Sequence, residues 1–140
     1  MDDSLVFSLS GSPRGKGRPR TSVRGGFAKI YTDADTRAYE RSVGVIARQA
    51  MGPRAPFEGP LSASLRFRLP LPKSMTKRRR ASILAGEEAY LGSLDIDNMA
   101  KAILDGMNAI AFLDDVQIVR LFVTKIGSDR PGVDVKITPL

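Results

Sequence analysis

Apolar and polar residues alternate without a break between residues 61 and 69. The apolar positions are Leu61, Ala63, Leu65, Phe67 and Leu69, and the polar positions are Ser62, Ser64, Arg66 and Arg68. Because successive side chains of a strand point to opposite faces, this pattern predicts a strand over residues 60–69 with one apolar and one polar face. Pro70 and Pro72 end it. The fold must therefore contain a β-sheet.

Four further segments are predicted to be strands. Residues 4–10 and residues 133–137 alternate in the same way, and residues 27–31 are compatible with a short strand. Residues 116–126 are long and apolar enough for a central strand. Turn-forming residues at 128–132 precede the last strand, so we expect the last two strands to pair as a β-hairpin.

Helices are predicted between these strands. Thr32 or Asp33 is expected to cap a helix that ends near Met51, where Gly and Pro follow. Ser74 is expected to cap a second helix that contains residues 77–80 and runs to Leu84 or Ala85, and a linker over residues 86–93 follows it. A third helix is expected in the acidic region described below. This order predicts an α+β fold, with a mixed or antiparallel sheet packed against helices.

Composition restricts the function classes. With 140 residues, we expect a single domain over residues 1–140. The chain has no cysteine and no histidine, which excludes thiolate zinc sites, a Ser-His-Asp triad and an imidazole base. No uninterrupted apolar run of about 18 residues occurs, and the acidic N-terminus lacks the pattern of a secretory signal. We expect a cytoplasmic protein that does not bind a membrane.

The net charge of +7 is unevenly distributed along the chain. Residues 1–90 carry 17 Lys and Arg against 8 Asp and Glu, whereas residues 91–140 carry 5 against 7. A basic half followed by an acidic one suits an enzyme that handles nucleic acid. Arg37, Arg41 and Arg48 lie at near-helical spacing, and we interpret this row as solvated helix surface.

Residues 11–26 are predicted to be a basic loop rich in Gly and Pro. Its cations are Arg14, Lys16, Arg18, Arg20 and Arg24, and it contains no acidic residue. Glycines allow a backbone to approach a phosphate closely, and Lys and Arg neutralise its charge. We therefore predict that Lys16, Arg18, Arg20 and Arg14 contact DNA; a mobile surface loop is the alternative.

Five carboxylates lie between residues 95 and 115, and four of them form two close pairs, Asp95 with Asp97 and Asp114 with Asp115. Asp95 and Asp97 would project to the same side of an extended segment. A helix is expected from Asn98, with Asp97 near its N-cap and Lys101 one turn further along the same face. The chain then turns back, which can bring Asp114 or Asp115 beside the first pair.

Carboxylates gathered in this way repel one another unless a divalent cation is present. Mg²⁺ would relieve the repulsion, bind a scissile phosphate and activate a water molecule. The structural alternative is that Asp97 only caps a helix and that Asp114-Asp115 is an ordinary turn. An EF-hand loop is excluded, because the sixth and twelfth positions counted from Asp95 are Ala100 and Gly106.

These residues resemble the RusA family of Holliday junction resolvases. The stretch from Asp95 to Lys101 resembles the family signature D-x-D-N-x-x-K, and I-L-D-G follows it. The stretch from Asp114 to Gln117 is similar to the family's D-D-x-Q element. The segment Lys16-Gly-Arg-Pro-Arg is similar to the basic N-terminal segment of many members.

The resemblance implies a Mg²⁺-dependent endonuclease, with Mn²⁺ as a substitute metal. It implies a homodimer that cuts a four-way DNA junction symmetrically during recombination and repair. Asp95, Asp97 and Asp115 would bind the metal, and Lys101 would act in catalysis or contact a phosphate. Asp114 and Asn98 would support the site.

Two other functions are compatible with the sequence. One is a non-catalytic basic DNA-binding protein with structural carboxylates, which would need no divalent cation. The other is a metal-dependent nuclease of broader scope that acts on flaps, branches or ordinary duplex. Competition between substrates distinguishes a broader nuclease from a resolvase, whereas the motifs do not.

Overall fold

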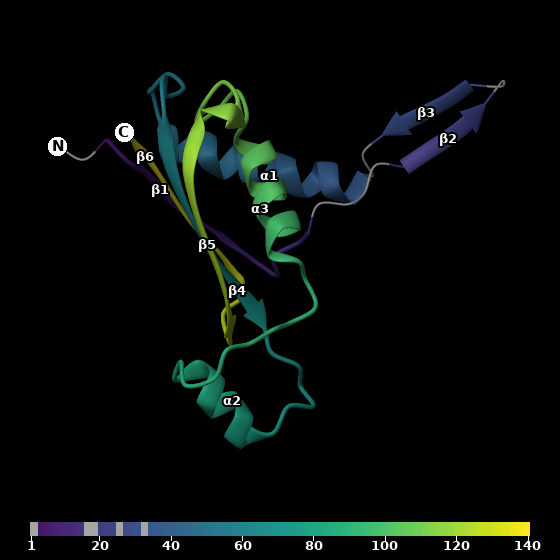
Figure 1. Ribbon diagram of the computed structural model, residues 1–140, viewed down its shortest axis with the longest axis vertical. Helices are drawn as coiled ribbons and strands as arrows, with labels where there is room; N and C mark the ends of the chain where they lie inside the picture. The colour runs from purple at the N-terminus through teal and green to yellow at the C-terminus, as the bar shows by residue number, and fades with distance from the viewer. Residues whose placement is uncertain (1–2, 16–19, 25–26, 32–33) are drawn as a thin grey trace.

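The computed structural model describes residues 3–15, 20–24, 27–31 and 34–140 (Figure 1). Along the chain the elements are β1 (Leu5–Ser10), β2 (Arg20–Arg24), β3 (Phe27–Tyr31), α1 (Ala34–Met51), β4 (Leu61–Pro70), α2 (Lys77–Leu84), α3 (Ile96–Met107), the 3-10 helix η1 (Asp115–Gln117), β5 (Ile118–Ser128) and β6 (Gly132–Pro139). Four of the strands form one mixed sheet. The predicted α+β fold is confirmed.

The main sheet has the strand order β1-β6-β4-β5. β4 runs parallel to β5 and antiparallel to β6, and β1 is antiparallel to β6. The alternating apolar residues of β4 from Leu61 to Leu69 are at most 3% exposed, as the pattern predicted. Figure 1 shows α1 and α3 on the same side of this sheet. The core lies between these two helices and the inward faces of the strands.

The prediction for residues 116–126 was wrong in two respects. β5 lies at the edge of the sheet, and β4 separates it from β6, so β5 and β6 do not form a hairpin. Three residues, 129–131, connect them, and three extended residues reach about 10 Å, which is two inter-strand spacings. Apolar composition did not reveal the edge position, because β5 leaves Val119 and Phe122 exposed.

Part of the predicted basic loop is a strand. β2 pairs antiparallel with β3, with Thr21 opposite Ile30, and Figure 1 shows this hairpin projecting from the rest of the protein. The β-branched residues Thr21 and Val23 favour a strand, and the Gly-Gly pair that follows is a typical hairpin sequence. The prediction had assigned that pair to the loop.

The first two helices follow the predictions except for the cap of α2. α1 ends at Met51 as expected, and its expected caps, Thr32 and Asp33, lie outside the described residues. The N-cap of α2 is Thr76 instead of Ser74, and the Thr76 hydroxyl accepts a hydrogen bond from the Arg79 N–H at 3.2 Å. Thr76 takes this role because its hydroxyl reaches a free N–H of the first helical turn. Within the described ranges, no helix is both long and apolar enough to span a bilayer.

Candidate active site

The first acidic motif lies at the start of α3. Asp95 is the N-cap residue, and α3 begins at Ile96, so the motif is not extended as predicted and the helix starts before Asn98. The Asp95 side chain makes no capping hydrogen bond; it accepts one from the Asn98 amide at 3.4 Å. Asp97 lies in the first turn, where the positive end of the helix dipole stabilises a carboxylate.

The second acidic motif is built into η1. Asp114 is its N-cap, and its carboxylate accepts a hydrogen bond from the Val116 N–H at 3.3 Å. The side-chain oxygen of Gln117 accepts from the Asp114 N–H at 3.2 Å, which completes a capping box. This arrangement holds Asp115 directly before β5, on the side of the sheet that faces α3.

The two motifs meet in one pocket of about 340 Å³ between α3 and β5. It is lined by Ile96, Asp97, Ala100, Lys101, Leu104, Asp115, Leu121 and Val123. The chain reversal after α3 thus brings Asp115 to the same pocket as Asp97. Asp95 does not line this pocket, although it lies two residues before Asp97.

Lys101 connects the charged groups of the site. Its ammonium nitrogen lies 3.4 Å from an Asp105 carboxylate oxygen and 4.0 Å from one of Asp115. The pKa of Asp115 is raised above its ordinary value, chiefly by a hydrogen bond with the Asp114 side chain and then by burial. The Lys101 charge lowers this pKa, whereas the charges of Asp114 and Asp105 raise it. The hydrogen bond with Asp114 and burial thus disfavour the charged form of Asp115, and Lys101 opposes them.

This environment fits a divalent cation. Asp97 and Asp115 supply carboxylate oxygens from two different elements, and Mg²⁺ is usually bound by one or two carboxylates together with water and phosphate. Within the part of the chain that the structure describes, no three acidic side chains are close enough to form a complete metal cage. The roles of Asp95, Asp97 and Asp115 as metal ligands and of Lys101 in catalysis stay predictions.

The N-terminal basic segment passes beside the first motif. A Cβ on Gly15 would lie 3.5 Å from the Cβ of Asn98, so the segment reaches the start of α3. Arg14 lies 3.8 Å from Asp35 of α1, and both side chains are largely exposed. Lys16 and Arg18 lie outside the described residues. Arg20 begins β2, and only its backbone is described.

Two side chains that sequence reasoning did not assign to the site hold the acidic motifs in place. The Gln117 amide nitrogen donates hydrogen bonds to the carbonyls of Phe57 and Gly59, at 2.9 and 3.0 Å. Lys125 of β5 donates to the Leu94 carbonyl at 3.0 Å, one residue before Asp95. Gln117 belongs to the D-D-x-Q element quoted for the family resemblance, whereas no sequence signal pointed to Lys125.

We expect Gln117→Met to destabilise the protein by about 2 kcal/mol, because four backbone groups lose a hydrogen-bond partner. Urea unfolding measures this loss. Gln49→Met, at an exposed glutamine of α1, is the matched control and should change stability by less than about 0.5 kcal/mol. Equal stability of the two variants would contradict the positioning role of Gln117.

Two comparisons with known proteins bear on this site. A family model described as Endodeoxyribonuclease RusA matches residues 10–138, which include both acidic motifs. The chain belongs to the RusA endodeoxyribonuclease family. It is also 32% identical to a Bacillus subtilis (strain 168) relative named Uncharacterized protein YqaN, over 141 residues that cover 96% of each chain. The family resemblance expected from the sequence is thus confirmed, and the relative's name adds no activity.

Proposed function

We propose that this RusA-family protein is a Mg²⁺-dependent endonuclease that resolves four-way DNA junctions. It cuts two strands symmetrically as a homodimer, in the cytoplasm, during recombination and repair; Mn²⁺ substitutes for Mg²⁺. One observation carries the proposal: Asp97, Lys101 and Asp115 line a single pocket in a member of an endodeoxyribonuclease family.

In this proposal Asp97 and Asp115 would bind the metal, and Asp95, which does not line the pocket, would have to approach them to become the third ligand. When bound, Mg²⁺ would supply Lewis-acid chemistry at the scissile phosphate and would lower the pKa of a water molecule. Lys101, more than half exposed beside Asp115, contacts a non-bridging phosphate oxygen. Asp114 and Asn98 orient the side chains next to them through the hydrogen bonds described above.

DNA reaches this pocket past the N-terminal basic segment. Gly15 lies against Asn98, so the first described part of this segment ends beside the acidic site. We propose that Arg14, Lys16, Arg18 and Arg20 neutralise phosphates of the bound strand. Their positive charge offsets the repulsion between DNA and the site carboxylates.

The homodimer of this proposal has a suitable surface in the edge strand β5. Among the described residues β5 pairs only with β4, so its other edge has free backbone groups. Val116, Val119, Leu121 and Phe122 are 46–77% exposed in and just before this strand. A long apolar edge strand tends to pair with another chain. Two copies joined here would be related by a two-fold axis, as the two cuts in a junction are.

We expect Phe122→Arg to shift the protein from dimer to monomer in sedimentation velocity, because it places a charge in the proposed interface. Val6→Arg is the matched control: Val6 and Phe122 are both 64% exposed, but Val6 lies on β1 at the opposite edge of the sheet. A dimer that survives Phe122→Arg and dissociates with Val6→Arg would place the interface on β1.

A plasmid that extrudes a cruciform tests the proposed function. Paired cuts across one junction linearise the plasmid, whereas independent single cuts first give an open circle. We expect linear product, formed only when Mg²⁺ or Mn²⁺ is present. Open circles that accumulate ahead of linear product, or equal cutting of plasmid without a cruciform, would instead indicate a broader nuclease.

A further inference from the structure

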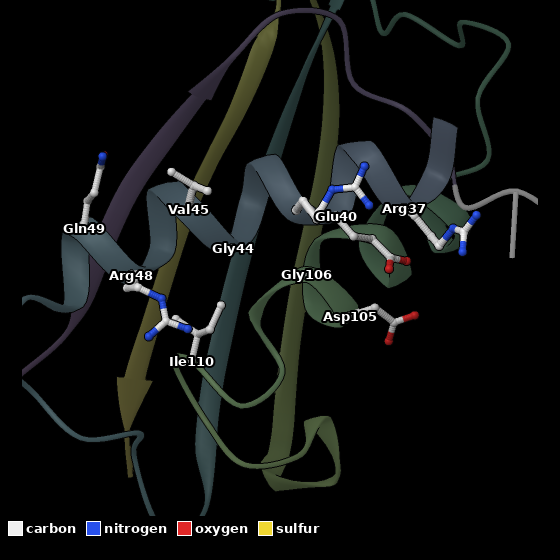
Figure 2. A pocket seen from close by; sticks show the side chains of 10 residues that line it. Arg37, Glu40, Gly44, Val45, Arg48, Gln49, Asp105, Gly106 and Ile110 are labelled. Carbon is white, nitrogen blue, oxygen red and sulfur yellow. The ribbon is translucent and has the colours of Figure 1, made fainter. Parts of the chain in front are cut away.

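A second hollow lies on the outer side of the helix pair, away from the pocket of the candidate active site. It is a groove of about 740 Å³ between α1 and the C-terminal half of α3, which we call the α1 groove. Figure 2 shows Arg37, Glu40 and Asp105 toward one end and Arg48 and Ile110 toward the other. None of the functions assigned above uses this groove.

The bottom of the α1 groove is formed by glycines where the two helices cross. Gly44 of α1 and Gly106 of α3 both line it. A Cβ on Gly106 would lie 2.7 Å from the Val43 Cβ and 2.9 Å from the Glu40 carbonyl oxygen. The helices can therefore approach each other this closely only because the site lacks a side chain, and the groove between their flanks stays open.

Three arginines of α1 border the groove: Arg37, Arg41 and Arg48. All three are exposed, and none forms an ion pair with another residue in the described part of the chain. At about 1.5 Å of rise per helical residue, the row is about 16 Å long. These three arginines outnumber the two carboxylates that also line the groove, those of Glu40 and Asp105. The excess of positive charge along the row favours an anionic ligand with repeated charges.

The α1 groove leads to the candidate active site through Asp105. Asp105 lines the groove, and its carboxylate lies 3.4 Å from the ammonium nitrogen of Lys101, which lines the active-site pocket. One strand of DNA has a phosphate about every 3.4 Å along the helix axis, so the arginine row is long enough for its three side chains to contact different phosphates of one strand. The ligand that fits both the charge and this continuity is a nucleic-acid backbone.

We propose that the α1 groove binds the phosphodiester backbone of a DNA arm that leaves the active site, through Arg37, Arg41 and Arg48. This inference rests on the proposed function, because it takes DNA as the substrate. It adds a second contact surface, separate from the N-terminal basic segment, and sets the direction in which the arm leaves. The row first interpreted as solvated surface thus becomes part of the DNA site.

The first test compares two double variants that each remove two positive charges. Arg41→Ala/Arg48→Ala alters the groove, and Lys73→Ala/Lys77→Ala alters exposed lysines before and at the start of α2. Junction affinity is measured between about 50 and 200 mM salt with Ca²⁺ in place of Mg²⁺. We expect the groove variant to lower the slope of log K against log salt by about 1.8 units, or about 0.9 per lost contact.

The control should keep the wild-type slope, and thermal melting should show that both variants are folded. An unchanged slope for the groove variant, or an equal decrease in the groove variant and the control, overturns the inference. Binding of an acidic peptide to the groove, with an unchanged slope for DNA, also overturns it. Cleavage by wild-type protein in Mg²⁺ is measured in parallel. Failure of that cleavage counts against the proposed function, whereas a normal cut with an unchanged slope counts against the groove alone.

A second test uses the absence of cysteine in the chain. Arg41→Cys and Lys73→Cys each introduce a single thiol, to which an iron chelate that cleaves nearby DNA is attached. We expect the probe at position 41 to cut one junction arm close to the enzymatic cut, on the side toward which the groove leads. The probe at position 73 should give no such cuts. The same pattern from both positions, or none from position 41, overturns the inference.

Discussion

Asp97→Asn should lower junction cleavage by at least about 10²–10³-fold, the scale on which removal of one preorganised electrostatic group acts. The amide keeps the size of the side chain but loses the charge that binds a cation. Junction binding should remain and become slightly tighter, because Asp97 is exposed and its negative charge would repel the phosphates of a bound junction. Single-turnover cleavage and a gel-shift titration measure the two effects separately.

Asp129→Asn is the matched control for this variant. It removes the same charge from an exposed residue in the turn between β5 and β6, and it should cut at the wild-type rate. If Asp97→Asn also cuts at that rate, the assigned chemistry is wrong. Loss of both cutting and binding would instead point to a structural role for Asp97.

Gly106→Ala should destabilise the protein by about 2 kcal/mol. The new methyl group would meet the Val43 Cβ at 2.7 Å and the Glu40 carbonyl oxygen at 2.9 Å, and neither is a flexible side-chain end. Overpacking of this kind costs about 1–3 kcal/mol, whereas the helix propensity of Ala recovers less than about 1 kcal/mol near a helix end. The melting temperature should fall by about 5 to 8 °C.

Gly44→Ala is the control at the same helix crossing. Its Cβ would meet the terminal methyl of Ile110 at 3.0 Å and the Gly106 carbonyl oxygen at 3.2 Å, and the methyl can move aside. In mid-helix the propensity gain is close to 1 kcal/mol, so the variant should stay within about 1 kcal/mol of wild type. Thermal melting measures both variants. A larger loss of stability for Gly44→Ala than for Gly106→Ala would contradict this account of the helix crossing.

Much of the fold was predictable because it depends on local pattern. The alternation in β4 identified an inward face whose apolar residues are almost completely buried. The position of β5 was not predictable in the same way, since strand order depends on contacts between distant segments. β5 is apolar on an exposed edge, and composition cannot distinguish an exposed apolar strand from a buried one.

In the candidate site, too, the features set by local sequence were predictable and those set by distant contacts were not. The spacing from Asp97 to Lys101 predicted that both side chains lie on the same face of a helix. In the structure both line the pocket that Asp115 also lines. The hydrogen bonds that Gln117 and Lys125 donate reach segments 60 and 31 residues away along the chain. No local sequence pattern predicts such bonds. The spacing of Arg37, Arg41 and Arg48 was visible in the sequence, but the groove beside them depends on how α3 crosses α1.

Cleavage of an end-labelled four-way junction tests the central claim most directly. The protein is incubated with the junction in Mg²⁺ or in EDTA, beside a linear duplex with the same arm sequences. We predict paired nicks at symmetric positions in the junction, only in Mg²⁺, and an intact duplex. Tight binding of the junction without any cut in Mg²⁺, or equal cutting of the duplex, would contradict the claim that this protein is a junction-resolving endonuclease.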